Sequence, residues 1–395
     1  EQEEKPRFVN PIQNEGKSIS YVYFTERQML EAFVNDMQSQ DPDMLIAWFG
    51  NFADLPKLIH RLHYNDIDSR LLSPYNEVKG IELGKVTKKI DNYSPISQPI
   101  RGRITLNLNL AFERQWTDSQ RGTLPSLALD YVAETVLGEK KLVSEKFPDK
   151  NDFFKRGWLE DTERYLEYAQ MDVELLCRID DEMGLSEGIL ALQRLIIAPF
   201  DACFYATNMG SIYFMRNADW KAPTGDKSKI KERYDGALIY NPLSEGTNGL
   251  HLGVAAFDYA GLYPAMMLAR NISFETISPI KTDFAVNLKI PRDFSPVTEK
   301  SMVYFKTDKL GLLPQSVLEL KTLRDEYKHR RNEAKDEQEY KKWNNSQMAV
   351  KRLMASFYGI IGYQGYGWAN VTLAAAITAS AREAIREVAF KVMEL

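Results

Sequence analysis

The sequence predicts an α/β domain followed by a region built around two long helices. Residues 1–185 alternate short β-like apolar runs with stretches of helical periodicity. A long charged helical stretch runs from Leu313 to about Tyr340, and a second covers Met348–Tyr358. We expect the polar stretch Gln338–Asn345 to contain the turn. Two long helices with a short polar connection predict an antiparallel hairpin.

Several segments of the first half support the α/β prediction. Met44–Phe49 has the pattern of a buried strand, and Leu55–Leu62 follows it as the start of a helix. Leu124–Leu137 and Asp161–Met183 carry apolar residues at helical spacing. Helices packed on a sheet satisfy this order of segments.

Composition excludes several classes of protein. The 395 residues allow two or three domains. Cys177 and Cys203 cannot form a disulfide framework and are typical of a reducing compartment. His60 and His63 have no cysteine pair nearby, which argues against zinc. The net charge of −5 decides little, since basic side chains can gather in one groove.

The second half contains a linker, a strand and a terminal helix. Ala218–Tyr234 is polar and mostly aperiodic, so it is interpreted as a linker or long loop. Leu250–Asp258 has an apolar strand pattern, and Val371–Leu395 is Ala-rich and helical. The last helix has no C-cap signal, so we expect the chain to end within a domain.

Asp258 lies where that apolar strand is expected to end. A turn through Ala260 and Gly261 follows, and Pro264 suits the first residue of a helix. The carboxylate, with the Tyr259 carbonyl, can hold Mg²⁺, which phosphoryl transfer needs. Alternatively, Asp258 only ends a strand or caps a helix.

The two long helices carry basic side chains at helical spacing. Those of the first helix share one face and are Lys321, Arg324, Lys328 and Arg331. In the second helix Lys351, Ala355 and Tyr358 share a face. Converging cations can bind a triphosphate. A solvated face interleaved with acidic residues is the alternative.

Two of these segments resemble motifs of the B-family DNA polymerases. FDYAGLYPAMM followed by NIS resembles motif A, usually D-F-x-S-L-Y-P-S-I-I. The resemblance implies that Asp258 is a catalytic metal ligand. It also implies that Tyr263 packs under the incoming sugar and excludes a 2′-hydroxyl. Gly261 replaces the usual serine, which weakens one contact without disturbing the metal site.

KRLMASFYG resembles motif B, K-x-x-x-N-S-x-Y-G. The residues that match it are Lys351, Ser356, Tyr358 and Gly359. Arg324 and Lys328 match the family's other triphosphate contacts. Ala355 replaces the usual asparagine, which puts one polar contact in doubt. The tail resembles a palm helix with T-x-x-G-R, at Thr378, Ala381 and Arg382, although close packing also explains its small residues.

The first half resembles the family's exonuclease. Asp41–Leu62 is similar to its second motif, which makes Asp54 a metal ligand; Phe49 and Ala53 depart from the pattern. A helix N-cap is the alternative for Asp54, since Pro56 follows. YAQMD fits the third motif, Y-x-x-x-D, and follows the family-like LGEKKL. Asp172 would then bind metal, and Tyr168 would orient the attacking water.

Residues 234–237, YDGA, resemble the motif that joins exonuclease and polymerase regions, with Tyr234 and Gly236 touching the template strand. A simple turn is the alternative. Two family motifs do not occur: no D-x-E pair lies near the start, and Asp-Thr-Asp is found nowhere. We therefore expect a fragment at both ends that is inactive alone.

The resemblance implies α/β plus α architecture with an RNase H-like exonuclease domain, a partial palm and helical-hairpin fingers. The implied domains are exonuclease 1–185, linker and palm start 186–249, palm 250–310, fingers 311–362 and truncated palm 363–395. The implied parent is a DNA-directed DNA polymerase with 3′–5′ proofreading that acts in replication or repair. Mg²⁺ at two-metal sites is the expected cofactor.

Expected partners are primer-template DNA, deoxynucleoside triphosphates and replication accessory proteins. No membrane contact is expected, because the sequence has no membrane-length apolar run, and a cytoplasmic nucleoid or a viral replication site is the expected location. Three rival functions stay open. They are a silent homologue that only binds DNA, a nuclease with a decorative polymerase half, and a small-molecule phosphotransferase, although no Gly-rich phosphate loop is present.

Overall fold

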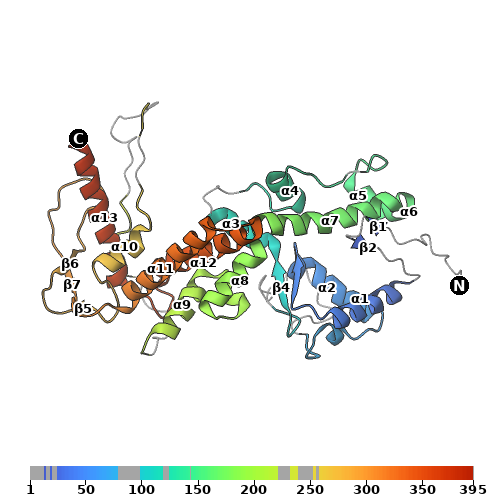
Figure 1. Ribbon diagram of the computed structural model, residues 1–395, viewed down its shortest axis with the longest axis horizontal. Coiled ribbons are helices and arrows are strands. Elements are labelled where there is room, and N and C mark those ends of the chain that lie inside the picture. The colour runs from blue at the N-terminus through green and yellow to red at the C-terminus, as the bar shows by residue number, and fades with distance from the viewer. Residues whose placement is uncertain are drawn as a thin grey trace. The chain divides into compact units, whose positions relative to one another are not determined.

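The computed structural model describes residues 13–14, 18–19, 25–78, 98–118, 124–142, 144–220, 232–238, 252–254 and 258–394. The chain divides into two compact units, Glu1–Ser186 and Glu187–Leu395. Helices predominate in both units, and the strands are short (Figure 1). In the described residues, no helix is long and apolar enough to cross a membrane.

Unit 1 contains a two-stranded parallel sheet formed by β3 and β4, in which Met44 is paired with Ile104. Its elements are β1 (Gln13–Asn14), β2 (Ser18–Ile19), α1 (Glu26–Gln40), β3 (Met44–Ala47), α2 (Leu55–Tyr64), β4 (Ile104–Asn107), α3 (Leu108–Asp118), α4 (Leu129–Leu137), α5 (Lys150–Asp152), α6 (Trp158–Glu160) and α7 (Thr162–Met183). The strand at Met44 and the helices at Leu55, Leu129 and Thr162 confirm the elements predicted there.

The core of unit 1 joins α1 to α2. Leu30, Val34 and Met37 of α1 belong to the same apolar cluster as Ile59 and Leu62 of α2. Spacings of three and four residues place each set on one helix face. The strand β3 is less buried than predicted. Ile46 is 39% exposed, so the prediction of full burial is wrong for that face of the strand.

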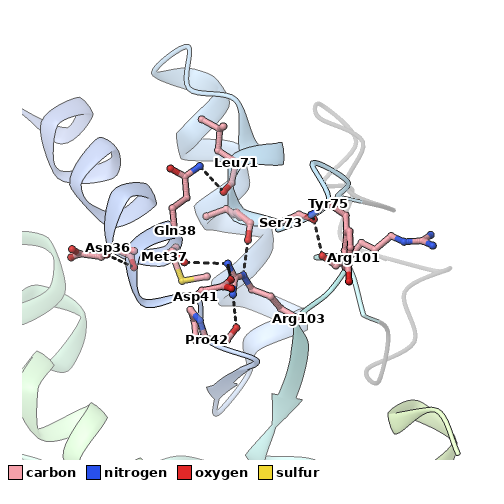
Figure 2. A network of polar contacts seen from close by, with 12 residues as sticks. Asp36, Met37, Gln38, Asp41, Pro42, Leu71, Ser73, Tyr75, Arg101 and Arg103 are labelled. Carbon is pink, nitrogen blue, oxygen red and sulfur yellow. Dashed lines mark hydrogen bonds and ion pairs between the residues drawn. The ribbon is translucent and has the colours of Figure 1, made fainter.

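Arg103, just before β4, fastens the start of the strand to the end of α1 (Figure 2). Its side chain is buried and donates to the carbonyl of Leu72 at 2.8 Å and of Met37 at 3.1 Å. It also forms a 2.9 Å ion pair with Asp41, which closes α1 in a left-handed conformation. A buried guanidinium is tolerated because its donors are satisfied in this way.

Unit 2 combines a helical hairpin with a small antiparallel sheet of order β5-β7-β6. Its elements are α8 (Leu185–Ile196), which starts at the junction, α9 (Ala206–Asn217), α10 (Leu262–Ala269), β5 (Ile277–Ser278), β6 (Phe284–Asn287), β7 (Met302–Phe305), α11 (Leu312–Asn332), α12 (Glu337–Gly362) and α13 (Val371–Met393). The helix predicted from Val371 onward is confirmed.

Helices α11 and α12 form the predicted hairpin, drawn in orange in Figure 1. Ring contact between Tyr327 and Trp343, 5.6 Å between centroids, links their facing sides. The turn does not lie in Gln338–Asn345, which is helical. Asp336 accepts a hydrogen bond from the Glu339 amide at 2.7 Å, so it caps α12 and starts the helix early. The predicted turn position was therefore wrong.

Two further predictions fall largely on residues that are not described. Most of the predicted strand Leu250–Asp258 lies outside the described residues, and residues 252–254 and Asp258 are not in a strand. Residues 221–231 of the predicted linker also lie outside them. The helix α10 begins at Leu262, so Pro264 is its third residue rather than its first. Proline fits there because the first helical amides lack intrahelical partners anyway.

Candidate functional site

Asp258 lies in an exposed turn at the entrance to α10. Gly261 adopts φ +77° immediately before the helix, a conformation that glycine reaches without strain. The described residues offer Asp258 no hydrogen bond or ion pair. The next side chain, Tyr259, donates a 3.3 Å hydrogen bond to the carbonyl of Ala384 in α13. The carboxylate is therefore available to a ligand from solvent.

Three tyrosines from separate segments meet beside α10. The Tyr234 and Tyr358 hydroxyls are 3.1 Å apart, and the Tyr263 and Tyr358 rings are 4.5 Å apart. Desolvation and the bond to Tyr234 raise the pKa of Tyr358 well above its ordinary range. Gly362 makes room for this pair, because a Cβ there would lie 2.8 Å from the Tyr234 hydroxyl. The YDGA, motif A and motif B segments thus interlock.

Arg382 anchors the YDGA segment from α13. Its side chain is 1% exposed and donates to the carbonyls of Asp235 and Ile290, each at 2.8 Å, and to that of Gly236. Thr378, one turn earlier, also donates to the Asp235 carbonyl, at 2.7 Å. Burial lowers the pKa of Arg382. The pattern of small residues therefore allows close packing and also fixes a candidate DNA-contacting loop.

Gln364 reinforces this loop and was not found by sequence reasoning. Its amide accepts from the Glu232 backbone N–H at 2.9 Å and donates to the Glu232 carbonyl at 2.7 Å. The two residues are 132 positions apart, so no local pattern signals the pairing.

The hairpin places its basic residues in different surroundings. Arg324 is half-buried and donates to Gln347 of α12 at 3.2 Å. Lys328 forms a 3.3 Å pair with Asp325 on its own helix. Lys351 is exposed and has no hydrogen bond or ion pair among the described residues. These cations belong to facing helices, as a shared anion site requires.

The motif B residues divide between two faces of α12. Lys351, Ala355 and Gly359, four residues apart, are exposed and share a face. Ser356 is buried and donates to the Leu353 carbonyl at 2.7 Å. A Cβ at Gly210 of α9 would lie 2.8 Å from the Ser356 hydroxyl, so this side of α12 is a helix-packing surface.

In unit 1, Asp54 ends a π-helical turn, Gly50–Asp54, and leads into α2. Asp54 thus occupies the N-cap position of α2, as the alternative interpretation predicted, but its side chain makes no capping hydrogen bond. Partial desolvation of the carboxyl raises its pKa, and Lys57 opposes this shift.

Asp172 lies on α7 in a 2.7 Å ion pair with Lys141, a residue of the LGEKKL segment. The same lysine lies 5.4 Å from the centre of the Tyr168 ring. The edge of that ring also contacts Phe153 and Phe154. The structure therefore brings Tyr168 and Asp172 together around Lys141, which sequence reasoning did not single out.

Carboxylate and carbonyl oxygens at Asp258, Tyr259, Asp54 and Asp172 are hard donors of the kind that Mg²⁺ prefers. The described residues contain no group of three or more His, Cys, Asp or Glu side chains positioned to hold a metal.

Comparison with known proteins finds similarity to one family. Residues 208–394 match DNA polymerase family B. A DNA polymerase of Pyrococcus glycovorans is 26% identical over 376 residues, which are 92% of this chain and 44% of that protein. A DNA-directed DNA polymerase of Escherichia phage RB69 is 24% identical, over 79% of this chain and 33% of that protein.

Among solved structures, the family B DNA polymerase of Pyrobaculum calidifontis superimposes with a TM-score of 0.64 at 20% identity. The match covers 93% of this chain and 45% of that structure. The chain thus spans a little under half the length of these archaeal proteins. The chain is therefore similar to family B DNA polymerases in sequence, and its fold resembles that of one of them.

Proposed function

We propose that this chain supplies the exonuclease, partial palm and fingers of a template-directed DNA polymerase with 3′–5′ proofreading. The observation that carries the proposal is the interlock of Tyr234, Tyr358 and Tyr263. It joins the template-contacting, sugar-contacting and triphosphate-contacting segments at one place. Residues 1–185, 186–249, 250–310, 311–362 and 363–395 serve as exonuclease, linker and palm start, palm, fingers and palm continuation.

In the polymerase site, Arg324, Lys328 and Lys351 hold the triphosphate, and Tyr263 packs under the sugar. Asp258 and the Tyr259 carbonyl hold Mg²⁺, which neutralises charge on phosphoryl oxygens when bound. Ala355 and Gly359 keep the adjoining face of α12 open for the nucleotide, and both are exposed. Tyr234 and Gly236 contact the template strand, in a loop held by Arg382.

In the exonuclease site, Asp54 and Asp172 contribute carboxylates, and Tyr168 orients the attacking water. Lys141 forms an ion pair with Asp172 and competes with the metal for that carboxylate. The sequence has no Asp-Thr-Asp to complete the palm, so the isolated chain binds primer-template and nucleotide without extending the primer.

Two measurements on the 395-residue chain test the proposal. Fluorescence anisotropy measures binding of a labelled primer-template, and a gel assay measures primer extension with Mg²⁺ and all four deoxynucleotides. We expect binding without extension, and extension once the chain is part of a complete polymerase. Absence of DNA binding contradicts the proposal. If the complete protein binds DNA without extending the primer, the result favours a silent homologue that only binds DNA. Ala355, which stands where motif B usually has asparagine, is the observation that favours this alternative.

A further inference from the structure

We propose that Asn271 is a positioning residue for the triphosphate site, because it fixes the start of α11. This inference rests on the proposed function. Motif A continues through α10 directly into residues 271–276, and this segment packs against the first turn of α11. Two of the three side chains proposed to hold the triphosphate, Arg324 and Lys328, project from α11, so the joint between the two segments sets their place relative to Tyr263.

The start of α11 has no side-chain cap of its own. Gly311 is the N-cap residue and lacks a side chain that could accept from the first amides. The amides of Gly311, Leu312 and Leu313 nevertheless all have acceptors. They donate to Asn271, Glu275 and Ser273 respectively, at 2.9 Å for Asn271 and 3.2 Å for Ser273. A distant segment therefore does the capping.

Asn271 makes the largest share of this joint. Its side-chain oxygen accepts from Gly311, and its amide nitrogen donates to the carbonyls of Lys306 and Lys309 at 2.7 and 2.8 Å. Its own backbone lies at φ +51°, a left-handed conformation that asparagine tolerates better than most residues. One 3% exposed side chain thus ties α10 to both ends of the 306–311 connection.

Ser273 and Thr276 make the joint tight. The Thr276 hydroxyl donates to the Asn271 carbonyl at 2.6 Å and accepts from the Ser273 amide at 3.0 Å. A Cβ at Gly311 would lie 2.4 Å from the Ser273 Cβ, so α11 approaches this segment as closely as glycine permits. The joint leaves little room for α11 to begin elsewhere.

A small change at the joint grows along the helix. Arg324 lies twelve residues beyond Leu312, about 18 Å along the axis at the usual rise per residue. A tilt of about 5° at the joint therefore moves Arg324 by about 1.5 Å, on the scale at which displaced binding groups lose their effect. The YDGA segment, which is proposed to contact DNA, is held by Arg382 and Thr378 of α13 and not by this joint, so DNA affinity should change little.

The test compares two variants of the 395-residue chain. Asn271→Gly keeps the left-handed backbone and removes the amide, whereas Val286→Ala shortens a buried side chain of β6 that makes none of the hydrogen bonds of the joint. Affinity for dATP in the presence of Mg²⁺ and a primer-template is measured by isothermal titration, DNA affinity by anisotropy and Tm by thermal unfolding. Ser273→Ala, which removes only the cap of Leu313, provides a graded third variant.

We expect Asn271→Gly to weaken dATP binding about tenfold or more while DNA affinity changes less than about twofold. Val286→Ala with a similar loss of Tm should leave dATP affinity within about twofold. Ser273→Ala should fall between the two. If Asn271→Gly binds dATP no worse than Val286→Ala, the inference is overturned. If the unmodified chain binds no dATP, the proposed function fails and takes this inference with it.

Discussion

Asp258 in unit 2 and Asp172 in unit 1 are both proposed metal ligands, yet the chain surrounds them differently. Asp258 is exposed and has no partner among the described residues, while its neighbours are tightly organised by Arg382 and the tyrosines. Asp172 is itself organised, in an ion pair with Lys141. At Asp258 the protein orders the neighbouring residues and leaves the carboxylate unpaired among the described residues. At Asp172 the carboxylate itself is paired with Lys141.

The largest effect is expected at the open carboxylate. In a complete polymerase that contains this chain, Asp258→Ala should lower primer extension by about 10³-fold or more, roughly 4 kcal/mol of activation free energy. Primer-template affinity should change by less than about 1 kcal/mol. Extension kinetics and anisotropy on one preparation measure both. If primer-template affinity fell as much as the extension rate, Asp258 would be a structural residue, and its contrast with Asp172 would disappear.

The second largest effect is expected at Arg382, which orders the residues around the unit 2 site. Arg382→Met should lower the free energy of unfolding by about 3 kcal/mol, because several buried carbonyls lose their donor. Urea unfolding measures this. Lys391→Met, at an exposed ion pair with Glu387, is the control and should change stability by less than about 1 kcal/mol. Equal losses in the two variants would contradict the anchoring role.

The ion pair in unit 1 should have a smaller effect. Lys141→Met removes the cation that competes with a metal for Asp172, so Mn²⁺ affinity of unit 1 should rise by about 1 kcal/mol, or roughly fivefold. Titration calorimetry with Mn²⁺ measures it. Lys140→Met is a matched control, because Lys140 is the preceding lysine and pairs with Glu134 instead of Asp172. Weaker Mn²⁺ binding in Lys141→Met would mean that the lysine organises the metal site.

Breaking the contact between Tyr234 and Tyr358 should have an effect as small as that of Lys141→Met or smaller. Tyr234→Phe keeps the ring but removes the hydroxyl bond to Tyr358, at a cost of about 1 kcal/mol or less. Because Tyr358 packs on Tyr263, discrimination between dATP and ATP should fall with it. Competition binding measures the ratio of the two affinities. An unchanged ratio would separate the YDGA segment from sugar selection.

The smallest effect is a pH dependence at Asp54. Desolvation raises its folded-state pKa above the ordinary 3.8, so its stabilising contribution is complete below pH 3.8 and is lost as pH rises through the folded-state value. At neutral pH, Asp54→Asn should therefore stabilise the chain slightly, and the gain should vanish in acid. Urea unfolding across pH measures this. A loss of stability at pH 7 would contradict it.

The pH dependence of stability should have the opposite sign at Asp130. Desolvation acts to raise its pKa, but hydrogen bonds from the Lys141 amide and Lys150 outweigh this and lower it below 3.8. Its contribution is present above pH 3.8 and disappears as pH falls through the folded-state value. Asp130→Asn should therefore destabilise the chain at pH 7 and not in strong acid, under the same measurement.

Sequence patterns predicted the helices better than the contacts between them. Apolar residues at helical spacing located α4 and α7, and Ala-rich composition located α13. The turn lies at Glu333–Asp336, earlier than the polar composition of Gln338–Asn345 predicted. Asp336 followed three residues later by Glu339 is a helix-capping pattern that the sequence contains and that marks the true start of α12. Contacts such as Tyr234 with Tyr358, 124 residues apart, depend on chain reversal that no local pattern encodes.

Resemblance to motifs located the segments of the candidate sites but not their support. Lys141 and Asn271 lie inside or beside recognised stretches, yet their partners are 31 to 40 residues away in sequence. Asp54 illustrates the reverse case. Its sequence context, with Pro56 following, also predicts a helix N-cap, and the structure places Asp54 at that position without the side-chain bond of a cap.

The junction between the units has a practical consequence for producing them. Gly184 closes α7 at φ +60°, and its amide bonds to the Asp180 carbonyl at 2.7 Å. Ser186 bonds to the Asp180 carboxylate through its amide and hydroxyl at 2.8 and 2.6 Å, so the closing contacts of α7 all precede Glu187. Separate genes for residues 1–186 and 187–395 would keep all of these closing contacts within the first half. The second half would then begin at the third residue of α8, so a start at Leu185 is needed to keep that helix whole.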